Sequence, residues 1–247
     1  MKVLVTGGTG NYGKYLVDFL KSCTDWEVHA PSSKELDICK PINLETKFDY
    51  IIHGATARHG RPKYIIDVNI LGTLNVLEFA EKCGSRLLYI SSADVMGTAG
   101  NDEPDPSSMY AATKYAGEVL CRKSLVPCAI VRSVNIYPCS GKFTDICKEK
   151  LLSGQKIKIY SGSRMYVHYS DVNEAIRMIV EKGETGNFNI PGEVLENVEV
   201  ARIIADQLNR PLDYELVEGG EAGYSIQGDN LLKLGWTPKV QFRSFRW

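Results

Sequence analysis

Residues 5–13 form a glycine-rich segment, Val-Thr-Gly-Gly-Thr-Gly-Asn-Tyr-Gly, directly after a short apolar run that begins at Lys2. A strand, such a turn and a helix bind a dinucleotide pyrophosphate: Gly7 permits the tight turn, Gly10 lets the backbone approach the phosphates, and Gly13 lets the helix pack closely on the strand. A helix starting near residue 11 would point its free N–H groups and positive dipole end at the anion. The segment therefore predicts a phosphate-binding loop formed by Gly7, Thr9, Gly10, Asn11, Tyr12 and Gly13.

Strand and helix patterns alternate through the first half of the chain. Expected strands cover 2–6, 26–30, 49–53, 86–91 and 128–132, and expected helices cover 11–22, 62–83 and 108–124. This alternation predicts an α/β fold, a Rossmann-type doubly wound parallel sheet with right-handed crossovers. Because ligands bind at the carboxyl ends of such strands, functional residues are expected just after each of them.

The second half alternates less regularly. Expected helices cover 143–153, 171–182, 197–208 and a short stretch near 230–234, and expected strands cover 156–160 and 187–190. We therefore predict a dinucleotide-binding Rossmann domain over residues 1–135, to which later segments return. Residues 136–247 are expected to form mostly a small C-terminal substrate-binding lobe.

Composition excludes several classes of partner. The net charge of −1 gives no electrostatic case for nucleic acid or a membrane surface. The sequence has no secretory signal pattern and no apolar stretch of the ~20 residues needed to span a bilayer. Seven cysteines without a CxxC pair are typical of reduced thiols in a cytoplasmic protein, and no metal site is expected.

A tyrosine and a lysine at helical spacing, Tyr110 and Lys114, form the second informative motif. Residues at i and i+4 lie on one helix face, and a nearby cation lowers the pKa of a phenol, which is otherwise near 10. Such a pair alone would be an ordinary surface pair. Together with the glycine loop and Ser91-Ser92 at a strand end, it predicts carbonyl/alcohol redox chemistry, in which Tyr110 moves the proton and Ser92 polarises the oxygen.

Several ordered motifs extend this interpretation over nearly the whole length. They are Thr6-Gly-Gly-Thr-Gly-Asn-Tyr-Gly13, Leu36-Asp37-Ile38, His53-Gly-Ala-Thr56, Asn69-Ile-Leu-Gly-Thr73, Ser91-Ser-Ala-Asp-Val-Met-Gly97, Tyr110 with Lys114, Arg164-Met-Tyr-Val-His-Tyr-Ser-Asp171 and Leu234-Gly-Trp-Thr-Pro238. In this order they resemble the extended short-chain dehydrogenases/reductases of the NAD-dependent epimerase/dehydratase family.

The resemblance implies a role for each matched residue. Ser92, Tyr110 and Lys114 would be catalytic, and Ser92, Asn135 and Arg164 would bind the substrate, with the guanidinium of Arg164 gripping a diphosphate. Beyond the glycine loop, the cofactor-binding residues would be Asp37, Ile38, Gly54, Ala55, Thr56, Asn69, Ser91, Tyr110 and Lys114.

Departures from the family pattern narrow the expected activity. Family members mostly act on nucleotide-activated sugars, and the dehydratases follow their catalytic threonine with an Asp-Glu pair. Here Ala93 cannot act as an acid, so dehydration is not expected, and Asp94 is interpreted as structural or solvent-facing. The stretch 218–224 lacks the second phosphate-binding arginine that is usual there, which favours a smaller or less firmly held substrate.

The turn after the second strand bears on the choice of cofactor. It reads His29-Ala-Pro-Ser-Ser-Lys34 and has no acidic residue until Glu35. NAD specificity usually rests on an acid at this place, whereas serines and a lysine suit a 2′-phosphate. The cofactor is therefore expected to be NAD or NADP, with NADP favoured.

Three functions remain open at this stage. The first is an NAD(P)-dependent sugar epimerase, and the second is an NADPH-dependent keto-sugar reductase similar to dTDP-4-dehydrorhamnose reductases, which residues 32–41 resemble. The third is a non-catalytic NAD(P)-sensing protein, which would not need Ser92, Tyr110 and Lys114. The family resemblance also implies a homodimer built from the helices expected at 62–83 and 108–124.

Overall fold

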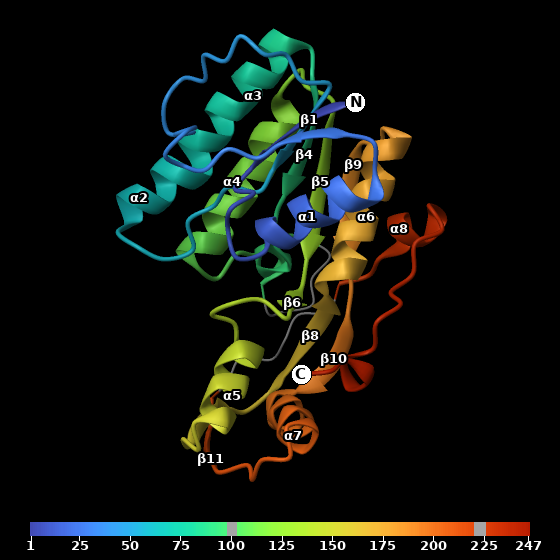
Figure 1. The fold of residues 1–247 in the computed structure, drawn as a ribbon. Helices are drawn as coiled ribbons and strands as arrows, with labels where there is room; N and C mark the ends of the chain where they lie inside the picture. The colour runs from blue at the N-terminus through green and yellow to red at the C-terminus, as the bar shows by residue number, and fades with distance from the viewer. Residues whose placement is uncertain (98–102, 220–225) are drawn as a thin grey trace.

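The computed structural model describes residues 1–97, 103–219 and 226–247 (Figure 1). Residues 220–224 of the arginine-free stretch thus lie outside the described residues. The strands are β1 Lys2–Thr6, β2 Glu27–His29, β3 Tyr50–His53, β4 Arg86–Ile90, β5 Cys128–Ser133, β6 Asn135–Tyr137, β7 Ile157–Tyr160, β8 Ser163–His168, β9 Gly186–Ile190, β10 Glu193–Glu196 and β11 Tyr214–Val217. The α-helices are α1 Gly13–Cys23, α2 Pro62–Ile66, α3 Gly72–Cys83, α4 Met109–Lys123, α5 Phe143–Leu152, α6 Tyr169–Lys182, α7 Asn197–Gln207 and α8 Asp229–Lys233.

The main sheet has six parallel strands in the order β2-β1-β3-β4-β5-β9, which confirms the expected α/β fold class. The order changes direction at β1, which has β2 on one side and β3 on the other. In open α/β sheets a ligand binds beyond the carboxyl ends of the strands at this switch point. The topology therefore indicates that the segments that follow β1 and β3 form the binding site.

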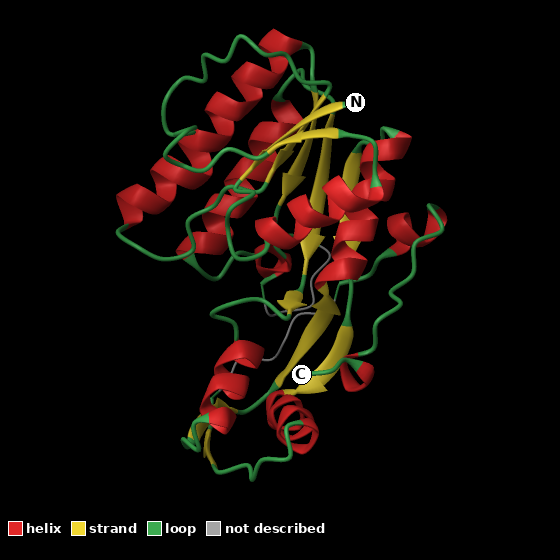
Figure 2. Ribbon diagram, in the orientation of Figure 1, coloured by secondary structure: helices red, strands yellow, loops and turns green. Residues whose placement is uncertain are grey.

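Helices cover both faces of the sheet. The helices α2, α3 and α4 lie on one face, and α1 and α6 lie on the other (Figures 1 and 2). Successive residues of a strand point to opposite faces. Accordingly, Val3 and Val5 pack in the cluster that contains Leu16 of α1, whereas Leu4 packs in the cluster that contains Phe79 of α3.

The helix expected over 62–83 is interrupted. Between α2 and α3, residues Asp67–Leu71 form a π-helical segment, η1. Such single π turns inside helices are frequent at functional sites. Here the turn carries Asn69 into the interior, and Gly72 follows it where an added Cβ would lie 2.7 Å from Ile38 Cδ1.

The lobe is built from two small sheets, β10-β8-β6 and β11-β7, with α5 and α7 beside them (Figure 2). The strands β6, β8, β10 and β11 were not expected from the sequence. In β8 the four consecutive residues Met165–His168 are all buried, so the strand lacks the alternation that identifies a half-buried strand. The chain then returns to the main sheet through α6 and β9.

Asp171 of α6 fixes the C-terminal segment. Its buried carboxylate accepts hydrogen bonds from the backbone N–H groups of Lys239 and Val240, both at 3.0 Å. Its carbonyl oxygen accepts a hydrogen bond from the indole N–H of Trp236 at 2.9 Å. The two sequence motifs that contain Asp171 and Trp236 therefore contact each other in the folded chain.

Candidate active site

The glycine loop between β1 and α1 is shaped by close backbone contacts. A Cβ added to Gly13 would lie 2.1 Å from the carbonyl oxygen of Gly7. A Cβ added to Gly7, where φ is +74°, would lie 2.6 Å from the backbone nitrogen of Ala55. The loop closes through a 3.0 Å hydrogen bond from the Gly10 N–H to the Gly7 carbonyl. The helix begins at Gly13, two residues later than expected, because Tyr12 is its N-cap. The tight cradle fits a dinucleotide pyrophosphate.

Two loop side chains bind the rest of the chain. Asn11 Nδ2 donates to the Ser140 carbonyl at 3.0 Å, and the Tyr12 hydroxyl donates to Asn173 Oδ1 at 2.8 Å. These bonds tie the loop to the β6–α5 connection and to α6. The side chain of Thr9 stays exposed. The donors that face a bound phosphate would thus be mainly backbone N–H groups.

The segment after β3 is held by Asn69. Its Oδ1 accepts hydrogen bonds from Thr56 Oγ1 at 3.0 Å and the Ala57 N–H at 2.7 Å, and its Nδ2 donates to the Ala57 carbonyl and to Thr113 Oγ1, both at 2.9 Å. The amide side chain is therefore fully engaged. Asn69 thus fixes the backbone at Ala57, in the segment that follows Gly54 and Ala55.

A neutral histidine lies beneath the cofactor cradle. Thr73 Oγ1 donates to the Asn69 carbonyl at 2.7 Å, so it accepts a hydrogen bond from His53 Nε2 at 3.0 Å. His53 Nδ1 then accepts a hydrogen bond from Thr6 Oγ1 at 2.6 Å. Burial, assisted by the charge of Lys114, lowers the pKa of His53 to about 3. His53 thus joins β1, β3 and α3 as an uncharged link.

Asp37 and Ile38 are placed differently from each other. The exposed carboxylate of Asp37 accepts a hydrogen bond from the Cys39 N–H at 3.1 Å and pairs with Lys40 at 3.2 Å. Ile38 is buried, and its carbonyl accepts a hydrogen bond from Asn75 Nδ2 at 2.7 Å. The segment is anchored on α3, which fixes its backbone beside the cradle.

Ser92 and Tyr110 meet at the carboxyl end of the sheet. Ser92 caps η2, the 3₁₀ turn Ala93–Met96, and its Oγ accepts a hydrogen bond from the Asp94 N–H at 3.2 Å. Ser92 also lies close enough to Tyr110 to lower the pKa of its phenol. Tyr110 begins α4, whose N-cap Ser108 accepts a hydrogen bond from the Ala111 N–H. A substrate oxygen placed between these two hydroxyls could exchange a proton with either.

Lys114 lies one turn further along α4 and is buried. Its ammonium nitrogen lies 3.9 Å from the ring centroid of Tyr89 on β4. Burial lowers the pKa of Lys114 from 10.5 to about 7, against the opposing effects of Cys121 and Glu118. The Lys114 ammonium therefore lies over the Tyr89 ring, and the charge of Arg58 is the largest influence that lowers the pKa of Tyr110.

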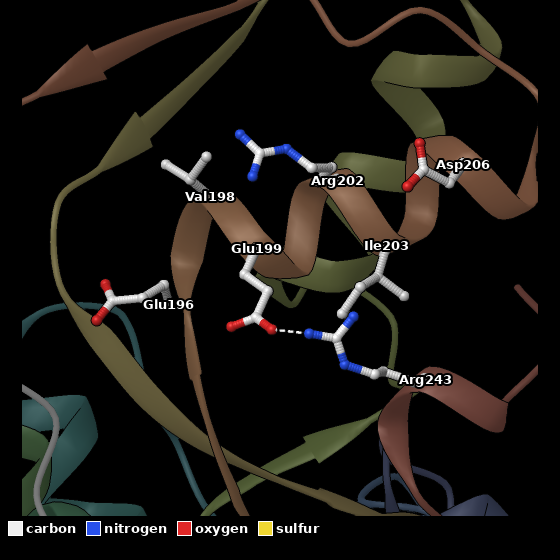
Figure 3. Close-up of a pocket in the computed structure, with 7 residues that line it drawn as sticks. All are labelled: Glu196, Val198, Glu199, Arg202, Ile203, Asp206 and Arg243. Carbon is white, nitrogen blue, oxygen red and sulfur yellow. Dashed lines mark hydrogen bonds and ion pairs between the residues drawn. The ribbon is translucent and has the colours of Figure 1, made fainter.

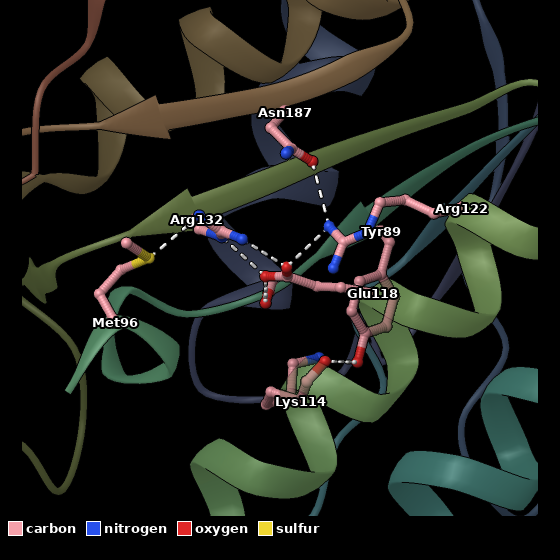
Figure 4. A network of polar contacts seen from close by, with 8 residues as sticks. Tyr89, Met96, Lys114, Glu118, Arg122, Arg132 and Asn187 are labelled. Atoms are coloured by element: carbon pink, nitrogen blue, oxygen red, sulfur yellow. Dashed lines mark hydrogen bonds and ion pairs between the residues drawn. The ribbon is translucent and has the colours of Figure 1, made fainter. Parts of the chain in front are cut away.

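Ser91 belongs to a buried network around Glu118 of α4 (Figure 4). Its hydroxyl donates to Glu118 Oε1 at 2.6 Å, and Arg132 binds both carboxylate oxygens, at 2.8 and 2.6 Å. Burial favours protonation of Glu118, but the bonds from Arg132 and Ser91 outweigh it and keep its pKa below the usual value. The side chain of Ser91 therefore stabilises the junction of β4, β5 and α4.

The expected substrate residues of the lobe lie on neighbouring strands. Asn135 of β6 donates through Nδ2 to the Met165 carbonyl of β8 at 3.0 Å, and Arg164 of β8 is exposed. Lys142, before α5, lies close enough to Arg58, Asp94 and Arg164 for their charges to act on its pKa, which burial lowers first of all. The cations of the lobe thus face the Tyr110 region.

Sequence reasoning missed Arg58 and interpreted Asp94 as structural or solvent-facing. The Arg58 guanidinium carbon lies 4.7 Å from the Tyr110 ring centroid, and Arg58 Nη2 lies 3.3 Å from Asp94 Oδ2. The pairing of Asp94 with Arg58 fits the structural interpretation. Its position two residues after Ser92 was a usable signal, whereas nothing local marked Arg58.

A separate pocket of about 490 Å³ lies on the lobe (Figure 3). Its lining comes from α7 and the segment around Arg243, which forms an ion pair with Glu199. It contains none of the expected site residues. In residues 1–97, 103–219 and 226–247, no group of three or more His, Cys, Asp or Glu side chains could hold a metal ion. No helix in that part of the chain is long and apolar enough to cross a membrane.

A parallel sheet with a glycine cradle at its switch point, and a serine–tyrosine pair beside it, define a Rossmann-type enzyme that uses a dinucleotide. Residues 3–191 match the model of the NAD dependent epimerase/dehydratase family, and the chain belongs to this family. It is 27% identical to a dTDP-glucose 4,6-dehydratase of Mycolicibacterium smegmatis, over 97% of this chain and 88% of that protein.

Solved structures share the fold. A dTDP-4-dehydrorhamnose reductase from Bacillus anthracis in complex with NADP has a TM-score of 0.88 at 22% identity, covering 98% of this chain and 94% of that one. A UDP-glucose 4-epimerase from Thermus thermophilus in complex with NAD has a TM-score of 0.83 at 23% identity, covering 98% and 96%. Both likenesses show the fold.

The buried lysine makes a prediction about stability. Because the folded chain releases the Lys114 proton near pH 7 and the unfolded chain near pH 10.5, unfolding binds a proton in this range. The free energy of unfolding should therefore rise with pH from about 7 to 10.5, as the cost of the buried charge disappears. The free energy of unfolding, measured with urea, should therefore rise more steeply with pH in the unsubstituted protein than in Lys114→Met. Parallel pH curves would contradict it, and the exposed Lys123→Met is the matched control.

Proposed function

We propose that this chain oxidises and re-reduces one carbon of a nucleotide-activated sugar, so that the net reaction is epimerisation. The observation that carries the proposal is the closeness of Ser92 to the Tyr110 phenol, at the carboxyl end of the same sheet that carries the glycine cradle. These hydroxyls would hold the oxygen of the reacting carbon, and Tyr110 would take and return its proton. A bound nicotinamide supplies the hydride chemistry.

The turn after Ser92 argues against net dehydration. Ala93 is buried and carries no acid, and the carboxylate of Asp94 is paired with Arg58 at 3.3 Å. An elimination needs a free base and a free acid near the sugar in addition to the tyrosine. The similarity to a dTDP-glucose 4,6-dehydratase therefore supports the substrate class more than the reaction.

A keto-sugar reductase that uses NADPH is the second candidate. The turn after β2 favours it, because the Glu35 carboxylate already accepts hydrogen bonds from the Ser32 N–H and hydroxyl, both at 2.8 Å. The exposed Ser33 and Lys34 remain to meet the adenosine ribose, and a lysine suits a 2′-phosphate. We therefore propose NADP as the preferred dinucleotide.

The cofactor proposal predicts what the purified protein carries. Mass spectrometry of the small molecules released on denaturation should find NADP. Stoichiometric NAD would contradict the preference and favour epimerisation, since an epimerase regenerates its cofactor in each cycle and tends to retain it. A loosely held NADP that exchanges at each turnover would favour the reductase.

The catalytic proposal predicts that Tyr110→Phe abolishes turnover and leaves dinucleotide binding intact. Tyr110→Phe removes the hydroxyl proposed to take and return the proton, and losses from removing such groups are about 10²–10⁴-fold. Turnover can be assayed with nucleotide sugars and binding by calorimetry. Tyr115→Phe, in the same helix, is the matched control. Unchanged turnover in Tyr110→Phe would overturn the assignment, and absence of turnover in both variants would favour the sensing function.

We also propose that the chain forms a homodimer through α2, α3 and α4. Exposed apolar side chains gather on these helices and the π segment: Tyr64, Ile66, Leu71, Leu74, Met109 and Val119. Such a group of apolar residues is typical of an interface. Light scattering should give about twice the chain mass of 27.5 kDa, and Leu74→Glu should return it to one chain. Leu232→Glu, on the distant α8, should stay dimeric, and a monomeric unsubstituted protein would contradict the proposal.

A reducing compartment, the cytoplasm, is proposed as the location. All seven cysteines are free thiols, including Cys121 near the end of α4 and Cys128 at the start of β5, which lie close enough to affect each other's pKa. Neighbouring thiols that remain unbonded are typical of proteins kept in a reducing environment.

A further inference from the structure

Arg58 covers the ring of Tyr110. It stands in the segment between β3 and α2, and its guanidinium carbon lies 4.7 Å from the ring centroid of Tyr110 at the start of α4. A planar guanidinium over an aromatic face is attracted by the ring quadrupole and can hydrogen-bond at its edge at the same time. The charge of Arg58 also lowers the pKa of the Tyr110 phenol, against the effect of burial.

Asp94 holds the guanidinium in place. Its Oδ2 lies 3.3 Å from Arg58 Nη2, and its side chain is only 20% exposed, whereas that of Arg58 is 44% exposed. Asp94 is fixed in turn by its N–H, which donates to Ser92 Oγ. Three separate segments therefore meet at one phenol: the loop after β3, the turn η2 and the helix α4.

The charges that face Tyr110 differ from those expected for a tyrosine–lysine pair. Burial raises the pKa of the Tyr110 phenol, Arg58 is the largest influence against it, Asp94 adds to the rise, and Ser92 lowers it by a hydrogen bond. Tyr89 lies on the inner side, where it contacts Lys114. Lys142 faces the Arg58–Asp94 pair from the lobe. Arg58 is thus the cation that most lowers the pKa of the Tyr110 phenol.

We propose that Arg58, anchored by Asp94, is a positioning residue for Tyr110: it holds the phenol ring against Ser92 and places a positive charge beside the phenol oxygen. Lys114, which shares α4 with Tyr110, lies on the ring of Tyr89. This proposal rests on the proposed function only in assuming that the Tyr110 phenol transfers a proton. The position of Arg58 relative to Tyr110 does not depend on that function.

A single-site titration tests the inference without any substrate. Tyr110 is replaced by a polyfluorinated tyrosine, whose more acidic phenol titrates in a range where the fold persists, and fluorine NMR follows this one residue. Arg58→Gln should raise the pKa of the phenol by about one unit, a roughly tenfold change in proton affinity, because a cation within about 4–6 Å favours the ionised form. Arg58→Lys should recover part of the shift.

The controls separate charge from folding. Arg61→Gln removes an exposed arginine from the same segment and should leave the titration unchanged. Circular dichroism and the other tyrosines serve as folding checks for each variant, and Arg58→Lys keeps the test open if Arg58→Gln unfolds. A titration of Arg58→Gln that matches Arg61→Gln would overturn the inference.

Anchoring by Asp94 is tested by a double-mutant cycle. In the Arg58→Gln background, Asp94→Ala removes a negative charge near the phenol and should lower its pKa. With Arg58 present, the same substitution releases the guanidinium, so the decrease should be smaller or reversed. Shifts that add up would overturn the anchoring role, because additivity marks independent sites.

Kinetics separate this inference from the proposed function. If sugar oxidation is observed, the pH at which its rate rises should be about one unit higher in Arg58→Gln than in the unsubstituted protein. The substitution should change kcat more than KM. A shifted titration without any sugar turnover would refute the function and keep the inference. Turnover with an unshifted pH profile and titration would keep the function and refute the inference.

Discussion

The contact between the glycine loop and the end of β3 is the constraint on which the rest of the site depends. Gly7 lies so close to Ala55 that a Cβ would meet its nitrogen at 2.6 Å, and Gly13 lies as close to the Gly7 carbonyl. These contacts bring the start of α1 over the switch point of the sheet. Any larger side chain at either glycine would push the helix, and its free N–H groups, away from the strand ends.

Beneath this contact, buried polar groups join the elements that carry the site. His53 links β1 to α3, Asn69 links the loop after β3 to α4, and Glu118 joins α4 to β4 and β5. A buried ion pair such as Glu118–Arg132 contributes little net stability relative to apolar residues. The pair instead fixes the orientation of the elements, because its hydrogen bonds form only when β4, β5 and α4 have one relative arrangement. That arrangement places Ser92 close to Tyr110.

Local patterns predicted the parts of the fold that depend on near neighbours. The strand at 2–6, the glycine loop, the capped helix of Tyr110 and the serine at the end of β4 all follow from periodicity and spacing. The π turn at Asp67–Leu71 and the lobe strand β8 did not follow. The first depends on the burial of Asn69 and the second on burial from both sides, and neither leaves a periodic trace in the sequence.

The sequence by itself determined the class of fold and the glycine cradle, and it singled out Ser92, Tyr110 and Lys114 as candidate catalytic residues, because each is encoded in a short segment whose local geometry is fixed by glycine or by helical spacing. Only the tertiary structure decided which cation faces which ring. Lys114 shares a helix with Tyr110 but is drawn under the sheet edge onto Tyr89, while Arg58 arrives from another crossover and is held by Asp94. Such pairings depend on how separate elements pack, and contacts between distant segments carry no signature in the order of residues.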